Sequence, residues 1–205
     1  MLWLHNEGEK GMAEAGGKRG ARSDARRNHE QLLKTTSALF REKGVMVPMK
    51  DIAREAGIGV GTLYRHFPHR ADLIAAVFRN EVDECATAAE RLCQAFSPSE
   101  ALEQWIALYV QLIVTKRGLA SVLHSGESAY ADLPTYFETH LVMSLEKLLQ
   151  RATGDIPDNV LATDVLRGIA LLCAPAAAGD LAQTQRLVNL FLKGLRYNEA
   201  NPGDE

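Results

Sequence analysis

Residues 49–68 read Met49-Lys-Asp-Ile-Ala-Arg-Glu-Ala-Gly-Ile-Gly-Val-Gly-Thr-Leu-Tyr-Arg-His-Phe-Pro68, and their spacing is typical of a helix-turn-helix. We predict one helix over residues 49–56 and a second over residues 60–67, which Pro68 stops because proline cannot continue a helix. Gly57 lies between them, where a sharp turn needs a positive φ. Two helices held in this way present the second one to a DNA major groove, which is wide enough to admit it.

The side chains of this motif divide into an inward and an outward set. Ile52 and Ala53 are expected to face inward on the first helix, and Leu63 to pack the second helix on the first. Because Leu63 already occupies the inward position, we predict that Phe67 is buried and that Tyr64 is exposed.

The rest of the chain after residue 22 is also helical by pattern, because its apolar residues recur at intervals of three and four. This predicts an all-α protein of about nine helices, with a three-helix head at the N-terminal end. A long helix containing residues 74–96 joins the head to a helical body, and Ser97-Pro-Ser-Glu100 is a capping box that opens the next helix. Further segments are expected at 119–124, from Leu133 to near Gly154, at about 158–173 and at about 181–196.

Composition excludes several classes of protein. The 205 residues, 46% hydrophobic and 24% charged, fall within ordinary globular usage. The three cysteines form no CxxC pair and have apolar surroundings, which indicates a reducing compartment, the cytoplasm. The longest nearly apolar run, residues 169–179, is too short to span a membrane. No metal-ligand pattern is complete, since Pro68 separates His66 from His69, and no cofactor is predicted.

Charge is distributed unevenly along the chain. Residues 18–70 contain 12 basic and 5 acidic residues, whereas residues 71–205 contain 10 basic and 18 acidic ones. This asymmetry favours a head that binds a polyanion, on a body that does not. Residues 1–22 contain five glycines and no apolar period, and are expected to form a flexible basic leader.

The segment IAREAGIGVGTLYRHFPHRADL, residues 52–73, is very similar to the DNA-binding signature of the TetR (tetracycline repressor) family. The resemblance at the level of motifs covers roughly residues 25–78. It implies a helix-turn-helix DNA-binding domain at 23–70, an effector-binding and dimerisation domain at 71–199 and a tail at 200–205. It also implies a repressor that binds pseudo-palindromic double-stranded operator DNA as a homodimer and is released by a small-molecule effector.

Carried over residue by residue, the resemblance predicts the DNA contacts. Tyr64 and His66 are expected on phosphates, because a phenol or an imidazole donates to phosphate oxygens. Since Val60 and Gly61 have no hydrogen-bonding side chains, direct base readout is expected from Thr62, Arg65 and Arg54, with Val60 on a thymine methyl. The predicted DNA-binding residues are Arg54, Val60, Gly61, Thr62, Tyr64, Arg65, His66 and Arg70.

Besides Val60 and Gly61, two positions around the motif depart from the family pattern. Pro48 stands where the family frequently has a threonine or serine, so that helix cap and its phosphate contact are expected to be missing. His69 replaces the usual small polar cap before the next helix.

The body offers two weaker sets of residues. The resemblance implies an apolar effector cavity, and its candidate residues are Trp105, Tyr109, His124, Tyr136, His140 and Met143. The last two helices have wide apolar faces and are expected to form a four-helix bundle with a second copy, through Leu161, Val165, Leu172, Leu187, Phe191 and Leu195. From pattern alone, both sets also suit the core of a monomer, and the effector candidates suit it better than a ligand site.

Two alternatives without DNA binding stay open at this point. One is a helical adaptor that binds protein through its last two helices. The other is an all-helical enzyme that uses His124, His140 and the nearby carboxylates Glu127, Asp132 and Glu138, although no catalytic motif supports it.

Overall fold

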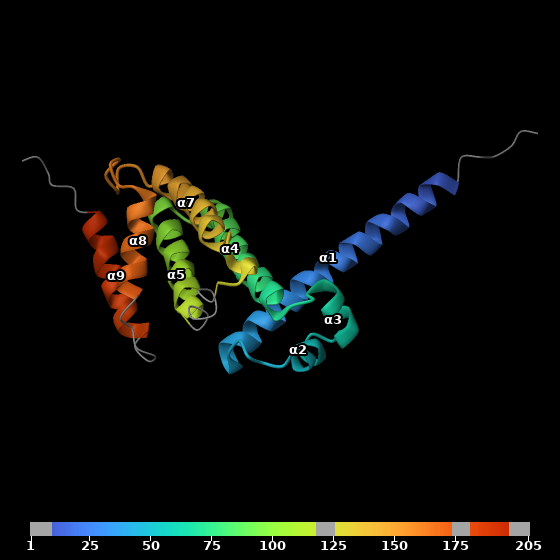
Figure 1. The fold of residues 1–205 in the computed structure, drawn as a ribbon. Helices are drawn as coiled ribbons and strands as arrows, with labels where there is room; N and C mark the ends of the chain where they lie inside the picture. Colours follow the sequence, from blue (N-terminus) through green and yellow to red (C-terminus); the bar gives the residue numbers. More distant parts are fainter. Residues whose placement is uncertain (1–9, 118–125, 174–180, 197–205) are drawn as a thin grey trace, which may run out of the picture. The chain divides into compact units, whose positions relative to one another are not determined.

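The computed structural model describes residues 10–117, 126–173 and 181–196 (Figure 1). The regular elements of these residues are helices, and the all-α fold class is confirmed. Within these ranges, one isolated bridge pairs Thr153 with Ile156. The elements are α1 (Lys10–Lys43), α2 (Met49–Glu55), α3 (Val60–His66), α4 (Arg70–Ala95), α5 (Pro98–Arg117), η1 (Ser128–Tyr130, a 3-10 turn), α7 (Leu133–Arg151), α8 (Ala162–Cys173) and α9 (Leu181–Leu195).

The chain divides into two compact units, Met1–Arg70 and Ala71–Glu205. We refer to the first as the head and to the second as the body, and each is described by itself. None of the helices in the described ranges is long and apolar enough to cross a membrane. The predicted segment 119–124 lies outside the described residues.

Helix α1 begins earlier than the sequence pattern suggests. It starts at Lys10, inside the stretch for which a flexible leader is expected. The physical reason is that Ala, Met, Glu, Lys and Arg, all good helix formers, outnumber the glycines of this stretch. They extend a helix whose nucleus lies further along the chain, so that each adds to it without the cost of nucleation.

The core of the head combines all three of its helices. The inward face of α1 is buried and ends at Phe40, whose carbonyl accepts a 3.0 Å bond from the Gly44 amide. Thr36 is also buried, and its hydroxyl donates to the Leu32 carbonyl at 2.7 Å. The apolar side chains buried in the head are Leu32, Leu33, Leu39, Phe40, Val45, Val47, Met49, Ile52, Ala53, Leu63 and Phe67.

In the body, the expected capping box at Ser97 is formed in part. Both the Ser97 amide and its hydroxyl donate to the Glu100 carboxylate, at 3.2 and 2.6 Å. These bonds favour the ionised form, and they lower the pKa of Glu100. The reciprocal carboxylate bond therefore fixes the start of α5.

Helix α8 begins at Ala162, about four residues later than predicted. Residues 152–161 form successive turns instead, in which the Asp155 and Ile156 amides both donate to the Ala152 carbonyl. A further turn joins the Val160 amide to the Pro157 carbonyl at 3.2 Å. Asp158 and Asn159, which follow Pro157, favour turns over a helix interior, so α8 begins only after them.

Candidate nucleic-acid interface

The turn between α2 and α3 is closed by backbone hydrogen bonds. The Gly57 amide donates to the Arg54 carbonyl at 3.1 Å, and the Ile58 amide donates to the Ala53 carbonyl at 2.9 Å. These two bonds make a Schellman ending, which needs a left-handed residue at its centre. Gly57 has φ +68°, as predicted from the sequence. The turn is thus fixed by the local sequence.

Buried side chains hold α3 against the rest of the head. Ile52, Ala53 and Leu63 have no exposed surface, and Phe67 is almost fully buried. Tyr64 is 48% exposed. The predicted division of the motif into inward and outward residues is confirmed at these positions.

The outer face of α3 consists of predicted site residues. Two positions along an α-helix turn a side chain by about 200°. Gly61 and Arg65, two positions before and after the buried Leu63, therefore lie at the middle of the outer face, and Thr62 and Tyr64 flank them. All four are exposed. The structure thus brings a hydroxyl, a phenol and a guanidinium together on one surface.

At the end of α3 the structure adds a residue that is not among the predicted contacts. The ring of His29, from α1, stacks on Phe67 with centroids 5.8 Å apart and lies 6.2 Å from the ring of His66. His29 is exposed, so two imidazoles from different helices border the outer face of α3. No sequence signal indicates this, because His29 and His66 meet only through the packing of α1 on α3.

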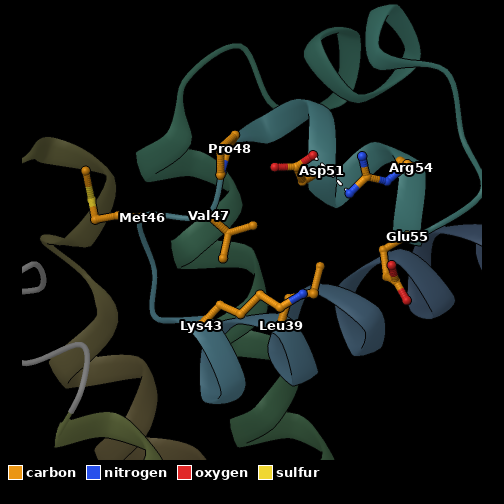
Figure 2. A pocket seen from close by; sticks show the side chains of 8 residues that line it. All are labelled: Leu39, Lys43, Met46, Val47, Pro48, Asp51, Arg54 and Glu55. Atoms are coloured by element: carbon orange, nitrogen blue, oxygen red, sulfur yellow. Dashed lines mark ion pairs between the residues drawn. The ribbon is translucent and has the colours of Figure 1, made fainter.

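Arg54 lies on α2, where it pairs with Asp51 at 3.1 Å. The pair borders a cleft of about 290 Å³. Figure 2 shows the pair together with the other side chains that line the cleft. The Arg54 side chain is 76% exposed, so its pairing contributes only about 1 kcal/mol or less and a phosphate can compete for the guanidinium. Lys50, one helical turn earlier, is also exposed. Lys50 is not among the predicted contacts, although its i, i+4 spacing from Arg54 is visible in the sequence. The cleft is lined by Leu39, Lys43, Met46, Val47, Pro48, Asp51, Arg54 and Glu55.

Arg70 has a role inside the head. Its Nη1 donates to the carbonyl oxygens of Val45 and Val47, at 2.8 and 2.7 Å. These bonds tie the start of α4 to the loop between α1 and α2. Arg70 is half-buried, and any bond to a phosphate would use its other nitrogens.

Pro48 provides no side-chain cap to α2, as the sequence predicts. Its carbonyl instead accepts bonds from the Asp51 and Ile52 amides, at 2.9 and 3.2 Å. The first turn of α2 is therefore closed by main-chain bonds alone.

In the body, the candidate effector residues fall into two groups. Trp105 and Tyr109 are fully buried; the Trp105 indole donates to the Cys85 carbonyl at 2.8 Å and the Tyr109 hydroxyl to the Leu166 carbonyl at 3.0 Å. Burial raises the pKa of the Tyr109 phenol well above its ordinary value. Their polar atoms are thus bonded within the body core.

Tyr136 and His140 form the second group, on α7. Their rings stack with centroids 3.9 Å apart, and the Tyr136 hydroxyl donates to Asp83 Oδ1 at 2.6 Å. Beside them, Arg79 Nη2 pairs with the Asp132 carboxylate at 2.7 Å. Met143 is exposed, and His124 lies outside the described residues.

The Tyr136 bond gives a prediction on stability. Burial, the bond to Asp83 and its charge raise the pKa of the Tyr136 phenol to about 12. A raised phenol pKa stabilises the folded state below the ordinary value near 10, and this stability is lost as the pH rises towards 12. We expect Tyr136→Phe to lower the unfolding free energy by about 1 kcal/mol at pH 7. We also expect it to weaken the alkaline loss of stability, as measured by urea unfolding. Tyr64→Phe, at an exposed phenol, is the control. If both variants change the unfolding free energy equally, the stabilising role of the Tyr136–Asp83 bond is contradicted.

The candidate dimer residues also separate in the structure. Val165 is buried in the body core, Leu161 and Leu187 are exposed, and Leu172, Phe191 and Leu195 are half-buried. Helices α8 and α9 pack together where the Phe191 ring lies over Gly168, so close that a Cβ there would stand 3.0 Å from ring atom Cζ. Two further leucines on this pair, neither of them a predicted dimer residue, are strongly exposed: Leu171 at 66% and Leu190 at 64%.

Across the described ranges, no group of three or more His, Cys, Asp or Glu side chains is arranged to hold a metal ion.

Two family models match the chain. The model described as bacterial regulatory proteins, tetR family, matches residues 32–77, and the model described as transcriptional regulator SbtR-like, C-terminal domain, matches residues 97–197. The first match covers the helix-turn-helix and the second covers most of the body.

Solved structures and curated relatives agree with these models. A TetR transcriptional regulator from Streptomyces coelicolor is 35% identical, with a TM-score of 0.66 over 81% of this chain and 97% of that one. A TetR regulatory protein from Mycobacterium vanbaalenii is 30% identical, with a TM-score of 0.66 over 86% and 99%. An HTH-type transcriptional regulator of Staphylococcus aureus is 28% identical over 70% of this chain and 83% of its own length. Another from that species is 30% identical, but the match spans only 59% of it.

Proposed function

Because this chain belongs to the TetR family of bacterial transcriptional regulators, we propose that it is a repressor that binds operator DNA as a homodimer and is released by a small-molecule effector. The observation that carries the DNA-binding part is the outer face of α3. Thr62, Tyr64 and Arg65 are exposed there, while Leu63 and Phe67 behind them are buried. The protein would act in the cytoplasm, with the DNA.

In this proposal the head contacts DNA through residues with different tasks. Tyr64 and His66 donate to phosphates and set the position of the head without reading sequence. Thr62 and Arg65 reach base edges, and Val60 contacts a thymine methyl. Arg54, Gly61 and Arg70 complete the contact set, with Lys50 and His29 as additions from the structure.

The dimer part rests on α8 and α9. Leu171 and Leu190 each expose about two thirds of their surface on two helices that pack together. Their burial against a second copy would remove apolar surface from water, and a two-fold axis brings the same patch from both copies together. Leu161, Leu172, Leu187, Phe191 and Leu195 would border this contact, with Val165 supporting it from the core. Two heads related by such an axis match a pseudo-palindromic operator.

The effector part rests on aromatic residues of the body, Trp105, Tyr109, Tyr136, His140 and Met143. Tyr136 and His140, stacked and only half-buried, are the best placed of them to meet a small molecule. An effector that binds better to a dimer with differently spaced heads would shift the population towards that dimer and so lower the affinity for DNA.

Measuring the distance between spin labels on the two heads, with and without the effector, tests this mechanism. An unchanged distance while DNA is released would reject it.

DNA binding is tested by titrating salt against binding to duplexes that the protein selects from a random-sequence pool. A regulator is expected to lose affinity steeply as salt rises, and to retain a sequence-specific preference. An adaptor or an enzyme would show neither property.

Two substitutions on α3 are expected to distinguish a residue that positions the head on the DNA backbone from a residue that reads the base sequence. Tyr64→Ala should weaken binding to all duplexes alike, since it removes a phosphate contact. Arg65→Ala should weaken the binding free energy for the selected duplex by about 1–3 kcal/mol and should relax the sequence preference at one base pair. Met46→Ala, at an exposed position of the head loop, is the control and should bind as the original chain does. If Tyr64→Ala binds DNA as tightly as the original chain, the assignment of Tyr64 to a phosphate contact is wrong.

A further inference from the structure

Gly61 has no structural reason to be a glycine in the free protein. It is the second residue of α3, its φ is not positive, and a Cβ built on it would meet nothing within 4 Å. A glycine inside a helix lowers the stability of the helix relative to alanine, because it loses more backbone freedom on folding. The contacts of the described head residues do not compensate for this loss.

The position of Gly61 on α3 points to what occupies the empty space. It lies at the middle of the outer face, nearly opposite Leu63, which has no exposed surface. Its neighbour Val60 is 40% exposed and also lacks a hydrogen-bonding group. The first turn of α3 thus offers bare main chain and a small apolar side chain, followed by Arg65 one turn later.

We infer that Gly61 is the point of closest approach between the recognition helix and the DNA, where the main chain itself packs against the floor or wall of the major groove. This inference rests on the proposed function and deepens it: α3 reads the base pairs beside Gly61 by shape and apolar contact. Side-chain hydrogen bonds begin only at Thr62 and Arg65. A Cβ at position 61 would hold the whole helix away from the groove and would lengthen the polar contacts around it.

The test is Gly61→Ala, which is expected to have opposite effects on the two properties of the protein. Without DNA, the midpoint of thermal unfolding should rise by about 2–4 °C, because alanine is the better helix former. With a duplex selected by the original chain, the affinity should fall about tenfold or more. Gly61→Ser, with a slightly larger side chain, should bind no better than Gly61→Ala. Met46→Ala should change neither property by a comparable amount.

Each outcome decides between the proposals. Unchanged affinity of Gly61→Ala, while the original chain binds its selected duplex, would overturn the inference and leave the proposed function intact. A lower unfolding midpoint would overturn it too, since glycine would then have a structural reason in the free head. If the original chain selects no duplex, the proposed function itself fails and the inference falls with it.

Discussion

Replacing Leu190 by glutamate is expected to turn the protein into monomers and to abolish binding to a pseudo-palindromic duplex. Leu190 is 64% exposed on α9, and in the proposed dimer it faces its own copy near a two-fold axis. Two carboxylates would then be buried without partners, at a penalty of several kcal/mol each. We expect the dimer dissociation constant to rise about 100-fold or more, as measured by analytical ultracentrifugation.

The matched control is Leu108→Glu, at a leucine of α5 that is 43% exposed and lies outside the α8 and α9 surface. It should leave the dimer intact. Leu171→Glu, on α8, should repeat the effect of Leu190→Glu, because both leucines belong to the same surface. If both Leu171→Glu and Leu190→Glu remain dimeric, the dimer interface lies elsewhere on the chain.

Leu63→Ala is expected to have the largest effect on the stability of the head. Leu63 has no exposed surface and is the buried contact of α3. Removing its side chain leaves a cavity, and such changes cost about 2–5 kcal/mol. Because a seven-residue helix is unstable by itself, we expect α3 to open locally and DNA affinity to fall with it.

Hydrogen exchange measures this opening directly. The amides of α3 should lose protection in Leu63→Ala while the amides of α5 and α7 keep theirs, since the body has a core of its own. Met46→Ala, at a side chain that is 74% exposed, should leave all of these amides unchanged. Normal protection of α3 in Leu63→Ala would mean that other contacts hold the recognition helix.

The sequence predicts residues of the candidate interface only where the pattern that identifies them lies within a short segment. Thr62, Tyr64 and Arg65 follow from one motif, and their placement depends on Gly57 and Leu63 within the same stretch. Lys50 could have been found by its spacing from Arg54. His29 could not, because its place beside His66 depends on how α1 packs against α3.

The sequence by itself determined the all-α class, the turn at Gly57 and the inward residues of the motif. These features depend on helical periodicity and on backbone preferences that act over a few residues, and such signals are present in any short segment. The tertiary structure decided what links distant segments. It assigned the Arg70 guanidinium to the carbonyls of Val45 and Val47, and it showed that Val165 faces the core while Leu171 and Leu190 face outward. The apolar faces of α8 and α9 are wider than one neighbouring helix can cover, so the sequence does not determine how each helix is rotated about its axis. Only packing against the other helices fixes which edge of the face is buried.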